Sequence, residues 1–113
     1  MKERKTLGRL AKAKIKGEKV IIKIDTGAYT GAIDKELAEK IGLEKIIKKK
    51  KVKSAHGESI RIMVKVPIKI KGEKLNTRLT LSNRKNLRYP IILGRKFLKG
   101  KFVIDPMKRC ALQ

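Results

Sequence analysis

The sequence has little of several residue types, and each shortage narrows what the protein can be. Cys110 is the one cysteine, so no disulfide can form within the chain, and a reducing compartment is favoured. There is no tryptophan, and only two phenylalanines and two tyrosines, which disfavours a base-stacking platform for nucleic acid. No apolar run approaches the roughly 20 residues that span a membrane, and the charged N-terminus lacks a signal-peptide stretch. We therefore expect a cytoplasmic protein without a membrane partner.

Positive charge is what the sequence has in excess. Its 32 Lys and Arg against 10 Asp and Glu give a net charge of +22 over 113 residues. Such a surface attracts polyanions, including nucleic acid and acidic protein segments, but it says nothing about chemistry. The length and the 41% hydrophobic content predict one globular domain over residues 1–113. The abundance of Lys, Glu and Ile is typical of an archaeal or thermophilic source.

Apolar runs and turn residues predict a mostly β protein. A hairpin is expected over residues 10–24, and the continuous apolar run of its second strand predicts burial on both faces. Alternation over residues 60–70 predicts a half-buried strand, in which Pro67 indicates an edge or a bulge. Two short helices are expected, over Lys35 to Ile41 and around residues 96–98, and the first is capped by Asp34 and ended by Gly42.

One short stretch occurs nearly twice. Ile15–Val20 is repeated with one change at Ile70–Leu75. Each copy is a hairpin turn that leads into an apolar strand, a loop containing glycine and a short helix. The repeat predicts two copies of one β-hairpin unit that pack about a pseudo-twofold axis.

The longer motifs resemble those of the retropepsin-like aspartic peptidases. They are Ile24–Ala28, Leu37–Leu43 and Ile91–Leu98, and the resemblance covers about residues 10–106. It implies a closed β-barrel with a short helix after each half. Within this class, Arg88–Arg95 and Phe102–Pro106 are similar to the prokaryotic RimB-type group, which is linked to the ribosomal-protein glutamate ligase RimK.

That group also carries the label of an ATP-dependent zinc protease, and the residues of this chain do not support it. One His and one Cys cannot build a tetrahedral zinc site within a chain, and no Gly-rich loop with Lys and Ser is present to bind ATP. We therefore expect no cofactor and no metal, with zinc shared between two copies left open.

Hydrolysis of a peptide bond by this class needs two carboxylates that hold one water and share one proton. The chain has three Asp, and two of them fit structural roles, since Asp34 is expected to cap a helix and Asp105 to end a strand. Asp25 is therefore the expected catalytic residue. Since one chain cannot supply the pair, we expect a homodimer in which Asp25 faces its own copy.

The resemblance assigns further residues to the site. Thr26 and Gly27 would support the loop, Ala28 would line the substrate cleft, and Gly94 and Arg95 would pack behind the loop or brace the dimer. Three residues of a hairpin that closes over the substrate would also bind it, namely Ala55, His56 and Gly57. Plainer interpretations stay open at this point: an ordinary turn at Asp25–Gly27, an exposed turn residue at His56 and a solvated Arg95.

The resulting hypothesis is a homodimeric aspartic peptidase that acts on peptides, with acidic, Glu-rich peptides favoured by its charge. Two alternatives of other classes remain. One is a catalytically silent module of the same fold whose basic surface binds RNA or the ribosome. The other is a small structural β protein with neither role.

Overall fold

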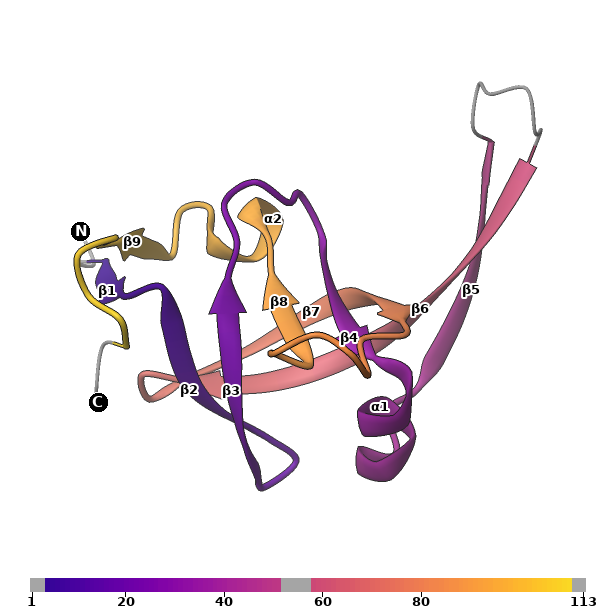
Figure 1. Cartoon of the computed structure of the whole chain (residues 1–113), viewed down its shortest axis with the longest axis horizontal. Coiled ribbons are helices and arrows are strands. Elements are labelled where there is room, and N and C mark those ends of the chain that lie inside the picture. The colour runs from indigo at the N-terminus through magenta and orange to yellow at the C-terminus, as the bar shows by residue number, and fades with distance from the viewer. Residues whose placement is uncertain (1–3, 52–57, 111–113) are drawn as a thin grey trace.

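The structure, a computed structural model, describes residues 4–51 and 58–110. In chain order they form β1 (Lys5–Leu7), β2 (Leu10–Ile15), β3 (Glu18–Ile24), β4 (Gly31–Asp34), α1 (Lys35–Ile41), β5 (Lys45–Lys51), β6 (Glu58–Ile70), β7 (Glu73–Ser82), β8 (Ile91–Leu93), α2 (Arg95–Leu98) and β9 (Phe102–Ile104). Within this part of the chain the strands β2, β3, β8, β4, β7 and β6 pair in that order, and β6 pairs back to β2 (Figure 1). The predicted mostly β, closed barrel with two short helices is confirmed.

The near-repeat of the sequence encodes the same turn twice. Lys16 and Gly17 join β2 to β3 with φ angles of 49° and 81°, and Lys71 and Gly72 join β6 to β7 with φ angles of 52° and 77°. A turn with positive φ at both central residues has a twist that matches that of the two strands it joins in a hairpin. Glycine adopts a positive φ without strain. Each half of the barrel therefore begins with a hairpin of one design.

The strand pairings obey the predicted pseudo-twofold symmetry. β3 runs parallel to β8, as β7 does to β4, while the pairs β4–β8 and β2–β6 are antiparallel. Exchanging the two halves converts each parallel pair into the other and leaves each antiparallel pair in place. A short helix follows β4 in the first half and β8 in the second (Figure 1).

The prediction that the strand after the first turn is buried on both faces was wrong. Ile22 and Ile24 are buried, but Ile21 next to Ile22 is 46% exposed. No other described element covers the outer face of β3 at Ile21, so the side chains of this strand alternate between the core and solvent. A continuous apolar run therefore overstated the burial.

The long strand β6 leaves the barrel part-way along its length. Val64, Val66, Ile68 and Ile70 are buried, whereas Ile62 is 38% exposed, so the predicted apolar face is buried only from Val64 onward. Residues before Met63 pair with β5 alone, and the two strands project from the barrel (Figure 1).

Pro67 lies where one edge of β6 changes partner. The pairing with β5 ends at Val64, and the pairing with β2 begins at Lys69. The missing N–H of proline therefore costs no ladder hydrogen bond on that edge, which explains why proline is tolerated there.

The helix α1 has the predicted bounds and caps. The Asp34 side chain accepts a hydrogen bond from the Leu37 N–H at 3.4 Å, and Gly42 ends the helix with a φ of 77°. Asp34 also accepts one from the Arg84 N–H at 2.7 Å, which the sequence did not indicate. The cap thus ties α1 to the loop after β7.

The N-terminal strand was missed by sequence reasoning. β1 pairs in parallel with β9, and Leu7 between them is fully buried. Asp105 donates its N–H to the Leu7 carbonyl at 2.8 Å. The first and last strands therefore lie together at one side of the barrel (Figure 1).

Candidate active site

The loop of residues 25–30, here the Asp25 loop, joins β3 to β4 at one end of the barrel. The Asp25 N–H donates to the Leu93 carbonyl at 2.9 Å, which continues the pairing of β3 with β8 by one residue. The chain then turns at once, as the Ala28 N–H donates to the Asp25 carbonyl at 3.2 Å. The position of Asp25 is thus set by the strand that precedes it and by a strand of the other half.

A backbone donor two residues away orients the Asp25 carboxylate. The Gly27 N–H donates to Asp25 Oδ1 at 3.0 Å. A Cβ placed on Gly27 would lie 3.2 Å from the same oxygen, so a side chain there would crowd the carboxylate. Asp25 is half-buried, while Thr26 and Gly27 are exposed. The acid is therefore held in one orientation at an accessible surface.

Gly94 and Arg95 lie directly behind the Asp25 loop. Gly94 is buried, and a Cβ there would come within 2.5 Å of the Tyr29 carbonyl oxygen, so only glycine fits. The Arg95 N–H donates to the Ala28 carbonyl at 2.9 Å, and Arg95 Nη1 donates to the Thr26 carbonyl at 2.8 Å. Residues about 70 positions apart in the sequence thus form one rigid unit with the loop.

The other two aspartates have structural partners. Both oxygens of Asp34 accept backbone hydrogen bonds, and the residue is only 8% exposed. Asp105 Oδ1 accepts from the Met107 N–H at 2.9 Å at the turn after β9. Of the three aspartates, Asp25 is thus the one whose side chain lies in a loop at the end of a barrel strand with a glycine beside it.

The predicted substrate-binding residues Ala55, His56 and Gly57 lie outside the described residues. The two strands that lead to them, β5 and β6, do form a projecting hairpin arm (Figure 1). In the described part of the chain, no group of three His, Cys, Asp or Glu side chains is placed to hold a metal ion. Nor does any helix there have the length and apolarity needed to cross a membrane.

Two neighbours of the site were missed by sequence reasoning. Tyr29 is 60% exposed, its ring lies 5.8 Å from the Arg95 guanidinium carbon, and its carbonyl accepts from the Lys96 N–H. Gly31 has a φ of 105°, and a Cβ there would meet the Ile92 carbonyl oxygen at 2.5 Å. A glycine where the loop re-enters a strand was the available signal for the second, while nothing in the sequence distinguished Tyr29.

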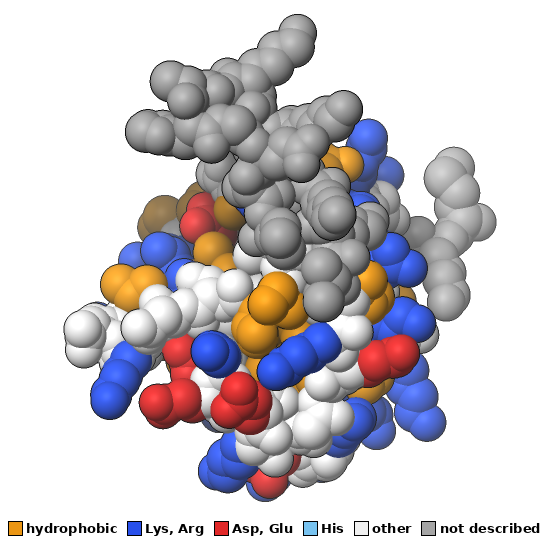
Figure 2. Space-filling view, turned by 90° about the vertical axis from the view of Figure 1, so that its right-hand side faces the viewer, with side chains coloured by type: hydrophobic (Ala, Val, Ile, Leu, Met, Phe, Trp, Pro, Cys, Tyr) orange, Lys and Arg blue, Asp and Glu red, His pale blue; other side chains and the backbone are white. Residues whose placement is uncertain are grey.

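The face that carries α1 and the hairpin arm combines apolar, acidic and basic side chains (Figure 2). Figure 2 shows hydrophobic side chains gathered at its centre, with acidic and basic side chains around them. α1 and the residues after it supply three of the carboxylates of the chain, Glu36, Glu39 and Glu44, and two of these pair with Lys45 and Lys65. Acidic and basic groups are therefore mixed on this side.

Solved structures with the same fold include proteases of retroviruses. Simian foamy virus protease is 25% identical with a TM-score of 0.59 over 78% of this chain and 89% of its own, and EIAV protease in complex with the inhibitor HBY-793 is 20% identical with a TM-score of 0.58 over 88% of each chain. A Legionella pneumophila protein of unknown function is 21% identical with a TM-score of 0.67, over 94% of this chain and 96% of that one. The barrel, its pseudo-twofold axis and the Asp25 loop define a retropepsin-like protein.

The family is narrower than the fold. The model of the RimB-like family, described as retropepsin-like aspartic endopeptidase RimB, matches residues 32–112, and the chain belongs to this family. The matched residues include Gly94 and Arg95 but begin after the Asp25 loop.

Curated relatives carry a different activity in their names. A probable alpha-L-glutamate ligase of Desulfotalea psychrophila is 34% identical over 68 residues, and one of Shewanella pealeana is 32% identical over 69 residues. The matches cover 59% and 60% of this chain but only 15% of each relative. The ligase activity in these names belongs to proteins of which this chain spans a small part.

Proposed function

We propose that the protein is an aspartic peptidase that works as a homodimer, with Asp25 of each copy forming the catalytic pair. The observation that carries the proposal is the Asp25 carboxylate, oriented by the Gly27 N–H in an accessible loop that Gly94 and Arg95 hold from behind. Membership of a family of aspartic endopeptidases supports it. Asp34 is buried with both oxygens bonded, and Asp105 follows β9, which lies outside the barrel sheet, so Asp25 is the candidate.

The chemistry requires one protonated and one ionised carboxylate around a single water molecule. The ionised carboxylate takes a proton from the water as its oxygen attacks the carbonyl carbon of the peptide. The protonated carboxyl donates its proton to the carbonyl oxygen, which gives a tetrahedral intermediate. This intermediate collapses with cleavage of the C–N bond: the carboxyl that took the proton of the water gives it to the departing nitrogen, and the other carboxylate takes a hydroxyl proton as the carbonyl forms again, which restores the pair.

Two surface features support a second copy of the chain as the partner. Tyr29, within the Asp25 loop, is 60% exposed, and a partner loop would cover it. The described strands β1 and β9 form a sheet of two strands, so each has an edge without a neighbour, and Val103 on β9 is 47% exposed. An isologous interface about a twofold axis would bury these groups together with both Asp25 loops.

Acidic, Glu-rich peptides are the proposed substrates. The matched segment occurs in relatives that are named as glutamate ligases, which connects it with proteins that act on glutamate. A dimer with a formal charge of about +44, twice the +22 of one chain, attracts such peptides over long distances. Turnover of a Glu-rich peptide should therefore fall steeply with added salt, and that of the matching Gln-rich peptide should be low throughout.

The Asp25→Asn variant tests the proposal. We expect a loss of at least about 10³-fold in cleavage of an unstructured Glu-rich peptide, measured by mass spectrometry, because the amide cannot act as a base. The thermal unfolding midpoint should stay within a few degrees, since Asn retains an oxygen that can accept from the Gly27 N–H. Equal cleavage by the wild type and the variant would contradict the proposal. So would a wild type that neither cleaves the peptide nor binds a statine-type inhibitor.

Mixing the two proteins tests the twofold arrangement. When wild-type and Asp25→Asn chains are denatured and refolded together in equal amounts, about one quarter of the dimers carry two aspartates. Activity per total chain should fall to about a quarter of the wild-type value. A fall to one half would mean that each Asp25 acts by itself, and a fall to only three quarters would mean that one Asp25 per dimer suffices; either result would contradict the proposed pair.

A further inference from the structure

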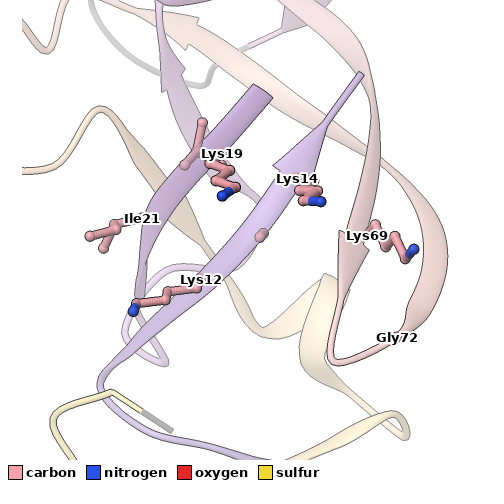
Figure 3. Close-up of a pocket in the computed structure, with 8 residues that line it drawn as sticks. Lys12, Lys14, Lys19, Ile21, Lys69 and Gly72 are labelled. Carbon is pink, nitrogen blue, oxygen red and sulfur yellow. The ribbon is translucent and has the colours of Figure 1, made fainter. Parts of the chain in front are cut away.

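A basic groove runs along the outer wall of the barrel, across β2, β3, β6 and β7. It consists of three adjoining hollows of about 600, 550 and 430 Å³. The first two share Lys14 and Lys69, and the last two share Lys16, Pro67 and Asn76. Figure 3 shows Lys12, Lys14, Lys19 and Lys69 around the first hollow. The basic lining residues of the whole groove are Lys12, Lys14, Lys16, Lys19, Lys65, Lys69, Lys74 and Arg78.

Four of these lysines stand in one row across four neighbouring strands. Lys19 is the direct partner of Lys14, Lys14 of Lys69, and Lys69 of Lys74. With strands about 4.8 Å apart, the row spans about 14 Å. The pseudo-twofold axis exchanges its two halves, because the six residues from Lys14 to Lys19 are repeated without change from Lys69 to Lys74. We call these four residues the lysine row.

The lysine row destabilises the folded protein when no ligand is bound. Like charges directly opposite each other on neighbouring strands destabilise a sheet. The ion pairs in the described part of the chain are Lys45 with Glu39 and Lys65 with Glu44, so no carboxylate there neutralises the row. An anion bound in the groove would remove this repulsion. At the lysine row the charge of the groove is thus complementary to an anionic ligand, while in the third hollow Glu44 pairs with Lys65.

The row lies far from the proposed active site. Lys19 is at the turn end of β3 and Asp25 follows its other end, so six residues of extended chain, about 20 Å, separate them. A peptide held in the Asp25 loop would not also fill the groove. The groove therefore needs an occupant of its own.

We infer that the basic groove binds the phosphate backbone of a nucleic acid without reading its sequence. Seven of the eight basic lining residues are lysine, a mobile point charge that can follow a phosphate backbone without fixing the geometry of each contact. Along the middle of the groove an extended acidic peptide would gain no backbone pairing, because Lys14 and Lys69 are paired on both sides and Pro67 lacks an N–H on the open edge of β6. The lining contains no aromatic ring, so bases have no stacking surface.

A matched pair of variants tests this inference. The groove variant replaces Lys14, Lys19, Lys69 and Lys74 with Gln, and the control variant replaces Lys35, Lys85, Lys99 and Lys108, which are exposed and line none of the three hollows. Both lose four charges. Binding of a fluorescently labelled 20-nucleotide RNA and of a DNA of the same length is followed by anisotropy at several salt concentrations. Thermal unfolding of each variant verifies that it folds.

The groove variant should lose about 10²-fold or more in RNA affinity at 0.1 M salt, and its log–log salt slope should fall by about 3, since four phosphate contacts are removed. The control should lose less than about tenfold. DNA should bind with similar affinity, as no base or 2′-hydroxyl is read. Equal losses in both variants, no binding by the wild type, or tighter binding of poly-glutamate or of acidic lipid vesicles than of RNA would each overturn the inference.

This inference stands apart from the proposed peptidase activity. Asp25→Asn should bind RNA as the wild type does, and the groove variant should cleave a short peptide carrying no net charge at the wild-type rate. Loss of one property without the other shows which proposal has failed.

Discussion

The two halves of the barrel share a scaffold but not an acid. Each begins with a hairpin closed by Lys and Gly at positive φ, and each ends in a short helix. The loop after β3 carries Asp25, whereas the loop of residues 83–90 after β7 contains no Asp or Glu. The second half instead supplies supports: the Leu93 carbonyl, Gly94 and Arg95. A duplicated scaffold with one acid can form a pair of acids only by meeting another chain.

The largest expected loss of stability comes from Gly94, where the second half of the barrel packs against the first. In Gly94→Ala the new Cβ would lie 2.5 to 2.7 Å from backbone atoms of Ala28 and Tyr29, which cannot move aside as a side chain can. We expect a loss of about 3 kcal/mol or more in the free energy of unfolding, measured by chemical denaturation.

Gly100→Ala is the matched control for this variant. Gly100 has a φ of 78° but no atom within 4 Å of an added Cβ. Only backbone strain remains, and the loss should be about 1 kcal/mol. Similar losses in the two variants would mean that Gly94 does not hold the Asp25 loop through close packing.

An intermediate loss of stability is expected at Asp34, where the helix cap of the first half is bonded to the loop after β7 in the second. Asp34→Ala removes the acceptor of both the Leu37 and the Arg84 N–H groups in a buried place. We expect a loss of about 2 kcal/mol in the free energy of unfolding, from the lost cap and an unsatisfied donor. Asp34→Asn keeps one side-chain oxygen as an acceptor, so its free energy of unfolding should fall by less. Equal losses in the two variants would show that these two hydrogen bonds contribute little to stability.

The smallest effect is expected at the seam between the hairpins, and it should be a gain. Replacing Lys14 and Lys69 with Gln removes the repulsion of a directly opposed pair. The free energy of unfolding should rise by about 0.5 kcal/mol at low salt, and the gain should vanish at high salt. Replacing Lys35 and Lys85, which are not paired across strands, should give no such gain. If the variant with Gln at positions 14 and 69 were less stable than the wild type, Lys14 and Lys69 would not repel each other as proposed.

Much of the fold follows from local patterns. Asp34 and Gly42 marked both ends of α1 correctly, because caps are decided by the φ, ψ and side chain of one or two residues. Ile21 shows where this reasoning stops: a continuous apolar run predicts burial on both faces, but only the number of layers around a strand decides it. β1 was missed because its partner β9 lies near the other end of the chain.

The chain by itself determined the two hairpin turns, the helix caps, the excess of lysine and the presence of a single Asp-Thr-Gly motif, since each depends on residues close together in sequence. The tertiary structure alone decided that Gly94 and Arg95 lie against the Asp25 loop, that Asp34 accepts from the Arg84 N–H, and that four lysines share one row. These depend on the register between strands that are far apart in the chain. Register is set by closing the barrel and filling its core, which no short stretch of sequence can specify.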